Sequence, residues 1–234
     1  MSAPGGAVGP GERELALQAP AGPVSALLLR PAQPRFLYVL AHGAGAGMRH
    51  PFLATVARAL ATRGVATLRY QFPYLERRRG RPDPPHVLEQ TVRAALAEAA
   101  RRLPGLPLFA GGKSMGGRMT SQAVAHAGDA PASVSGLVFL GFPLHPPRQP
   151  DDRRGQHLDA VPLPMLFLQG TRDELADLDR IRALTERLGG RATLHVVEDA
   201  DHAFHVRKRT GRTDAAVLEE LADVMADWFR LIAK

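Results

Sequence analysis

The stretch LPLFAGGKSMGGRMTSQAVAH, residues 106–126, decides the fold of this chain. In it an apolar run leads into four glycines around Lys113 and Ser114, and a run with helical spacing follows. Two motifs share its centre. GKS at 112–114 resembles the end of a phosphate-binding P-loop, whereas GKSMG at 112–116 matches the pattern G-x-S-x-G. The first motif would make Lys113 a phosphate clamp, and the second makes Ser114 a candidate nucleophile.

The P-loop interpretation fails on its own geometry. Its full pattern, G-x-x-x-x-G-K-[ST], needs a glycine at the start of a loop whose backbone amides surround the phosphates. The residue five positions before Gly112 is Pro107, which has no backbone N–H to donate. That position also lies inside the apolar run, so no loop is available there.

The G-x-S-x-G interpretation has the structural context it requires. A predicted strand leads into the motif and a predicted helix leads out, which is the strand–turn–helix of a nucleophile elbow. The residues two before and two after Ser114 must have almost no side chain, and both are glycine. Gly117 leaves further room between helix and strand. The sequence therefore predicts Ser114 in a strained backbone conformation at the C-terminal edge of a sheet.

Predicted strands and helices alternate along nearly the whole chain, which is typical of a mostly parallel sheet with helices on both faces. We predict an α/β fold class: one domain with a sheet of about seven to eight strands and no large lid. The domain is expected over residues 13–234, with 1–12 as a flexible tail. The longest irregular stretch, 141–160, is too short for a large lid. The expected strands are 14–19, 24–29, 35–43, 65–70, 106–112, 134–142, 163–170 and 192–200, and the expected helices are 52–64, 86–103, 118–127, 177–190 and 214–233.

The composition indicates a globular protein. Of the 234 residues 45% are hydrophobic and 23% charged, and the absence of cysteine excludes disulfides and thiolate chemistry. The formal charge of +7 comes mostly from arginines spread along the chain, so we expect no nucleic-acid partner. No signal peptide and no apolar run of about 18 residues is found, so we expect no membrane association and a cytoplasmic location.

An acid and a histidine follow the serine in the order that such a fold uses. A serine hydroxyl is a weak nucleophile until a base takes its proton. Asp173 comes directly after the predicted strand 163–170, and His202 comes directly after the predicted strand 192–200. We predict Asp173 as the orienting acid and His202 as the base.

Each of these two residues has rivals nearby in the sequence. Glu174 and Asp177 lie toward or within the next helix, where a solvated or capping role is expected. His195 lies inside a predicted strand. His205 forms an H-x-x-H pair with His202, but no third metal ligand with matching spacing is present, so no metal site is predicted.

Small residues after the third predicted strand suit an oxyanion hole. One donor is expected from the amide of Met115 and the other from HGAGAG at 42–47, with Ala44 preferred and Gly43 as the alternative. His42 is expected to brace this loop. A dinucleotide-binding pattern would need glycine where Met48 stands, so that interpretation fails.

Taken together, five segments resemble the α/β-hydrolase superfamily, and within it the small dienelactone-hydrolase-like branch. They are AHGAGAGMRHPFL, GGKSMGGRM, GFPLHPP, LPMLFLQGTRDEL and DADHAFHV, which lie within residues 36–206. GFPLHPP resembles most a group related to testis-expressed and histone-acetyltransferase-complex subunit proteins. The resemblance implies Ser114 as nucleophile, Asp173 as acid and His202 as base. It implies no cofactor and leaves the substrate open.

Several further residues are candidates for the mouth of the site. Lys113 is expected at its rim. His145 either reaches the mouth or has a proline-braced structural role, and Phe72 and Tyr74 either wall an acyl pocket or pack in the core. The arginines between Arg77 and Arg81 either attract an anionic substrate or form an ordinary solvated loop.

The sequence as a whole predicts a serine hydrolase that cleaves an ester or related acyl bond of a small molecule through an acyl-enzyme. Carboxylic esters, lactones and thioesters all fit this chemistry. A catalytically silent scaffold that binds a protein partner is the alternative, because fold and function separate easily.

Overall fold

The computed structural model describes residues 11–126, 134–147, 149 and 151–234. These residues form one eight-stranded sheet with the strand order β1-β2-β4-β3-β5-β6-β7-β8. Strand β1 pairs antiparallel with β2, and β2 pairs antiparallel with β4. The strands from β4 to β8 are parallel to one another. The strands are β1 Glu12–Ala19, β2 Gly22–Leu29, β3 Phe36–Ala41, β4 Val65–Tyr70, β5 Leu108–Lys113, β6 Val134–Leu140, β7 Met165–Gly170 and β8 Ala192–Val197.

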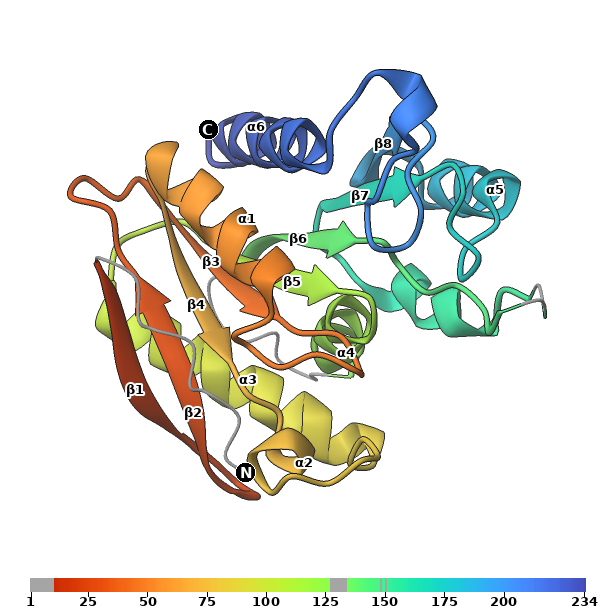
Figure 1. Cartoon of the computed structure of the whole chain (residues 1–234). Helices are drawn as coiled ribbons and strands as arrows, with labels where there is room; N and C mark the ends of the chain where they lie inside the picture. Colours follow the sequence, from red (N-terminus) through yellow and green to blue (C-terminus); the bar gives the residue numbers. More distant parts are fainter. Residues whose placement is uncertain (1–10, 127–133, 148, 150) are drawn as a thin grey trace.

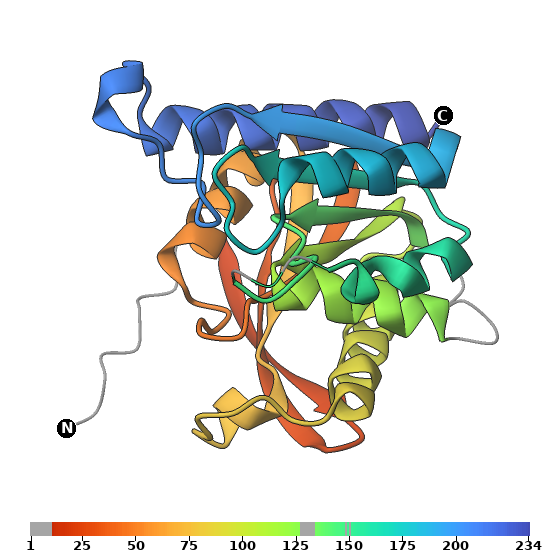
Figure 2. The same cartoon turned by 90° about the vertical axis from the view of Figure 1, so that its right-hand side faces the viewer.

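Helices cover both faces of this sheet (Figures 1 and 2). One apolar core lies between the sheet and the helices α3, α4 and α5, and the other lies between the sheet and α1 and α6. The inner strands β3, β4 and β7 are buried along their whole length and are mostly apolar, because helices cover both of their faces. The helices are α1 Pro51–Thr62, α2 Pro73–Glu76, α3 Pro85–Arg102, α4 Met115–Ala125, α5 Leu178–Leu188 and α6 Asp214–Ile232, with 3-10 helices η1 Arg153–Ala160, η2 Gly189–Arg191 and η3 Lys208–Thr210.

The predicted fold class is confirmed, and most predicted elements fall within a few residues of the observed ones. Helix α4 begins at Met115 rather than at 118, because the turn of the elbow passes directly into the helix. Between β6 and β7 the described residues form only a loop and η1, so no lid domain is built there. Neither the short helix α2 nor η1 has a periodic pattern of apolar residues from which it could be predicted.

The sheet begins at Glu12, one residue before the expected start of the domain at residue 13. Residues 1–10 lie outside the described part of the chain. Glu12, however, is the first residue of β1, pairs with Leu29, and places its carboxylate against the buried guanidinium of Arg69. An isolated buried charge is costly unless it is paired, so this contact ties the start of β1 to the sheet.

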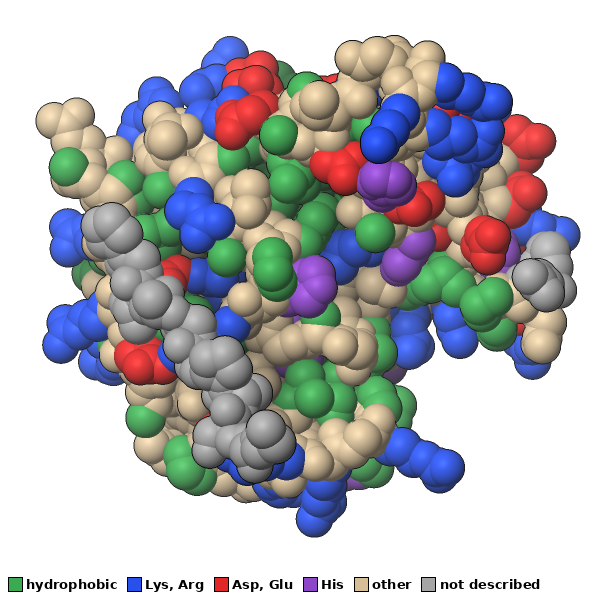
Figure 3. Space-filling view, viewed as in Figure 1, with side chains coloured by type: hydrophobic (Ala, Val, Ile, Leu, Met, Phe, Trp, Pro, Cys, Tyr) green, Lys and Arg blue, Asp and Glu red, His purple; other side chains and the backbone are tan. Residues whose placement is uncertain are grey.

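Basic side chains are distributed over the surface. On the face shown in Figure 3, Lys and Arg side chains are interspersed with acidic and neutral ones, and the coloured residues form no continuous basic stripe. Within the described residues no helix is both long and apolar enough to cross a bilayer.

Candidate active site

Ser114 lies in the tight turn between β5 and α4, at the carboxyl edge of the sheet. Its backbone has φ 52° and ψ −121°, a conformation that residues with a side chain rarely adopt, and the predicted strain is therefore present. A Cβ on Gly112 would overlap the carbonyl oxygen of Ala41, and one on Gly116 would lie 2.6 Å from the carbonyl oxygens of Ala41 and His42. The two glycines let β3 pass directly beneath the turn, which pushes the hydroxyl of Ser114 out above the sheet.

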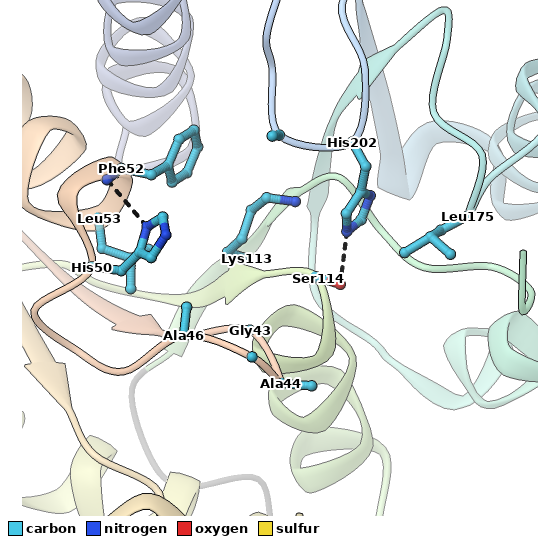
Figure 4. Close-up of a pocket in the computed structure, with 12 residues that line it drawn as sticks. Gly43, Ala44, Ala46, His50, Phe52, Leu53, Lys113, Ser114, Leu175 and His202 are labelled. Atoms are coloured by element: carbon cyan, nitrogen blue, oxygen red, sulfur yellow. Dashed lines mark hydrogen bonds between the residues drawn. The ribbon is translucent and has the colours of Figure 1, made fainter. Parts of the chain in front are cut away.

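The structure brings Ser114, His202 and Asp173 together in one hydrogen-bonded chain. The Ser114 hydroxyl donates to Nε2 of His202 across 2.9 Å, as Figure 4 shows, and Nδ1–H of His202 donates to Oδ2 of Asp173 across 2.7 Å. The Asp173 side chain is completely buried, whereas a quarter of the His202 side chain is exposed. The imidazole can therefore take a proton from the serine while a buried carboxylate holds its tautomer.

Gln169, which sequence reasoning missed, holds Asp173 in place. Its side-chain amide donates to Oδ2 of Asp173 across 2.6 Å, and its oxygen accepts from the amide of Phe142. The amide of Leu175 donates to the other carboxylate oxygen across 2.8 Å. The only sequence signal for Gln169 is a single amide side chain at the end of the otherwise apolar run MLFLQG.

Gly141 was also missed. A Cβ at this position would lie 3.1 Å from Nζ of Lys113 and 3.4 Å from both Oδ2 of Asp173 and Cε1 of His202. Its φ of 69° is in the left-handed region that favours glycine. The missing side chain leaves the space in which these three groups meet.

Three of the rival residues, Asp177, His205 and His195, have other partners. Asp177 caps the N-terminus of α5 by accepting from the amide of Arg180 across 3.1 Å. His205 donates from Nδ1 to Asp214 at the start of α6, and His195 contacts Glu220 on α6. Neither histidine contacts Ser114.

A second serine–histidine contact joins Ser121 in α4 to His157 in η1. Nε2 of His157 lies 2.8 Å from Oγ of Ser121, but the Ser121 hydroxyl already donates to the carbonyl oxygen of Arg118 one turn earlier in α4. Burial and the nearby Arg118 charge lower the pKa of His157 to about 4. Within the described residues no carboxylate contacts His157, so this pair lacks the third member of a triad.

The amides expected to form an oxyanion hole have no internal partner. Within the described residues, neither the N–H of Met115 nor that of Ala44 donates to another protein group. The Ala44 loop is held from below, because the Tyr74 hydroxyl donates to the Ala44 carbonyl oxygen across 2.7 Å. His42 accepts from the amide of Phe72 through Nε2, and burial lowers the pKa of His42 to about 4, so the ring is a neutral brace.

Ser114 lines two pockets. The larger, about 450 Å³, is lined mainly by apolar groups, among them Phe52 and Leu53 from the start of α1, and is drawn in Figure 4. The smaller, about 320 Å³, is lined by Met115 and by side chains from α3, α4 and η1. Ala44, Ser114 and Leu175 line both pockets.

Phe72, Tyr74 and His145, which were expected either at the mouth of the site or in structural roles, do not lie at the mouth. Phe72 and Tyr74 are buried against His42 and line neither pocket that contains Ser114, which corresponds to core packing. His145 is also buried, where Nε2 accepts from the amide of Asp177 across 2.9 Å and links two loops. None of the arginines of the loop at 77–81 lines either pocket. Gly43 lines the larger pocket beside Ala44.

Lys113 was expected at the rim of the site. The residue lines the larger pocket, but its ammonium is buried and has no hydrogen-bond partner among the described residues. Nζ lies 5.7 Å from the centre of the Phe204 ring, close enough for a cation–π contact. Burial lowers the pKa of Lys113 to about 8, although the charges of Asp173 and Asp201 oppose this shift. Its place at the rim stays a prediction, while the structure puts the ammonium of Lys113 in the wall of the larger pocket, where Nζ is buried.

Replacing Lys113 by methionine is expected to raise the free energy of unfolding at pH 7. The pKa is about 8 in the folded chain and has its ordinary value of 10.5 in the unfolded chain. Below pH 8 both states carry the proton and the folded state bears the full cost of the buried charge, about 3 kcal/mol at about 1.4 kcal/mol per pH unit. Between pH 8 and 10.5 only the unfolded chain holds the proton, so wild-type stability rises with pH. Urea unfolding from pH 7 to 10 should show the advantage of Lys113→Met shrinking; a constant difference would contradict the assignment.

Comparison with known proteins places this geometry in a family. Residues 34–230 match the model of the family described as "Alpha/beta hydrolase domain", which covers the elbow, the acid and the histidine. The chain belongs to the α/β-hydrolase family. The match begins just before β3 and ends in α6, so it leaves out β1 and β2.

Solved structures of other α/β-hydrolases have the same fold. A dienelactone hydrolase from Anabaena variabilis is 22% identical, with a TM-score of 0.74 over 94% of this chain and 97% of that one. An α/β serine hydrolase without a lid from Xanthomonas campestris is also 22% identical, with a TM-score of 0.74 over 93% and 94%. An α/β serine hydrolase homologue from Coxiella burnetii is 20% identical, with a TM-score of 0.73 over 90% and 95%.

These comparisons confirm the superfamily that the five sequence segments resemble. At such identities the solved structures establish the fold of this α/β-hydrolase and not its substrate. The finer grouping with testis-expressed and histone-acetyltransferase-complex subunit proteins stays a prediction.

Proposed function

We propose that this protein is a serine hydrolase that cleaves an ester or related acyl bond of a small molecule. The observation that carries the proposal is the hydrogen-bonded chain from Ser114 through His202 to the buried Asp173. Family membership supports hydrolase chemistry, and the geometry of the three side chains supports the acyl-transfer mechanism of a serine nucleophile.

In the first half of the proposed reaction, Oγ of Ser114 attacks the carbonyl carbon of the substrate while its proton moves to Nε2 of His202. Asp173 stabilises the imidazolium that forms and does not itself take the proton. The negative charge on the substrate oxygen is held by the amides of Met115 and Ala44, with Gly43 as the alternative to Ala44. His202 then gives the proton to the leaving group, and an acyl-enzyme remains.

In the second half, water replaces the leaving group. His202 takes a proton from the water as it attacks the acyl carbon, and returns that proton to Oγ of Ser114 when the acid departs. No further group is needed to balance this reaction. The larger pocket beside Ser114, about 450 Å³ and mainly apolar, suits an acyl or alcohol portion of small to medium size.

A fluorophosphonate probe tests the proposal directly, because it phosphonylates an activated serine and spares unactivated hydroxyls. Wild-type protein is expected to be labelled, and mass spectrometry of the digest is expected to find the adduct on Ser114. Hydrolysis of p-nitrophenyl acetate should fall in parallel with labelling. Protein that is folded but neither labelled nor able to hydrolyse the ester above background would instead favour the scaffold alternative.

A further inference from the structure

The smaller pocket beside Ser114 contains an unusual combination of charges. Arg118, one turn after Ser114 in α4, and Arg154 in η1 both line it, and η1 packs directly against α4. Asp83, at the end of the loop before α3, lines it as well. Two cations and one anion therefore face a space of about 320 Å³ that opens onto the nucleophile.

The two arginines have no partner of opposite charge in the part of the chain that the structure describes. Within the described residues, neither Arg118 nor Arg154 forms an ion pair or a side-chain hydrogen bond, and Nε of Arg118 is buried without an acceptor. Burial and the neighbouring charge of Arg154 both lower the pKa of Arg118. Oδ2 of Asp83 is likewise buried without a donor, so the acid does not neutralise the pair.

Two like charges held together in a partly buried place cost free energy unless something compensates them. Most other arginines of the described chain are paired: Arg153, the neighbour of Arg154, forms an ion pair with Asp151 across 2.9 Å. The guanidinium presents several N–H donors in a planar fork that matches a carboxylate or phosphate group. A carboxylate or phosphate that entered the pocket would compensate both charges.

We propose that Arg118 and Arg154 form a subsite that binds an anionic group, carboxylate or phosphate, of the substrate whose acyl bond meets Ser114. This proposal rests on the proposed function and names its substrate class. The larger pocket, which Ser114 also lines, is mainly apolar. The substrate thus carries an apolar portion that fits the larger pocket and an anionic group that fits the smaller one. The arginines at 77–81 do not take part, because none of them lines this pocket.

The test compares esters that differ only in charge. On the leaving-group side, 4-carboxyphenyl and 4-phosphonophenyl butyrate are compared with neutral 4-carbamoylphenyl butyrate. On the acyl side, the mono-p-nitrophenyl ester of glutaric acid is compared with p-nitrophenyl pentanoate.

For the anionic ester that fits, Arg118→Met and Arg154→Met are each expected to lower kcat/KM by about ten-fold or more, mostly through KM. The matched neutral ester should change by less than about three-fold. Whichever of the carboxylate and phosphonate esters responds more strongly identifies the anion.

Three further variants separate charge recognition from structural effects. Asp83→Asn is expected to act in the opposite direction and lower KM for the same anionic ester, because it removes a repulsive charge. Arg153→Met, a change on η1 in a side chain that is 81% exposed and paired with Asp151, should leave both esters unaffected. Arg81→Met should also have no effect, since Arg81 itself does not line the pocket.

The outcomes distinguish the two proposals. If the neutral esters are hydrolysed in a Ser114-dependent way but no anionic ester responds to Arg118→Met or Arg154→Met, the subsite is wrong and the hydrolase stands. If no ester of either kind is hydrolysed, the proposed function is wrong, and the subsite proposal that rests on it is wrong with it. Thermal unfolding shows whether Arg118→Met and Arg154→Met are folded. If the folded variants lose kcat/KM equally for neutral and anionic esters, the subsite proposal is also wrong.

Discussion

Replacing Ser114 by alanine is expected to abolish fluorophosphonate labelling and to lower kcat/KM for acyl esters by at least about 10⁴-fold. The hydroxyl is the proposed attacking atom, and within the described residues no other serine is joined to a histidine that a carboxylate orients. Activity that remains would come from water held near the oxyanion donors. Thermal unfolding should stay close to that of wild type, because alanine meets the same backbone strain at φ 52° as serine does.

Ser121→Ala is the matched control for this prediction. Ser121 also contacts a histidine, His157, but donates its proton to the backbone of its own helix. Its replacement should change kcat/KM by less than about three-fold. If Ser121→Ala destroys activity and Ser114→Ala does not, the roles of the two serines must be exchanged and the proposed mechanism is wrong.

Replacing Gly111 by alanine is expected to prevent folding or to remove most of the stability of the domain. Gly111 lies in β5, at the centre of the sheet, and a Cβ there would overlap the carbonyl oxygen of Val138 in the neighbouring strand β6. Relief requires two paired strands to separate, since neither atom belongs to a flexible side chain. The cost is several kcal/mol, a large part of the roughly 5–15 kcal/mol that stabilises a typical domain.

Circular dichroism and urea unfolding measure this effect, with Gly190→Ala as the control. Gly190 lies in η2, after helix α5, and a Cβ there would have no atom within 4 Å. Its replacement should therefore shift the free energy of unfolding by less than about 1 kcal/mol. Soluble Gly111→Ala protein with wild-type stability would show that β5 and β6 are further apart than the structure places them.

The sequence determined the features that depend on local pattern. The alternation of apolar runs and amphipathic runs is enough to predict the α/β class, because parallel strands buried on both faces must be apolar and the helices between them must be amphipathic. The elbow at Ser114 could also be predicted from the sequence, because only glycine at positions 112 and 116 fits so tight a turn. Chain order then pointed to Asp173 and His202, because each follows a predicted strand.

Only the tertiary structure decided which side chains face one another. Gln169 looks like the polar end of an apolar strand until the fold brings it against Asp173, 2.6 Å away. Lys113 belongs to the elbow motif in the sequence. In the structure its ammonium lies near the Phe204 ring, buried and without a hydrogen-bond partner among the described residues. Burial depends on contacts from distant segments, and a local pattern contains no record of them.

For the charged residues near the site, too, the sequence and the tertiary structure point to different groups. The sequence shows a dense run of arginines at 77–81, and charge density in a sequence attracts attention to an exposed loop. The arginines that line a pocket beside Ser114, Arg118 and Arg154, are 36 positions apart and unremarkable in the sequence. What sets them apart is that the packing of η1 on α4 brings them together without an acid to pair with, and only the folded chain can impose that proximity.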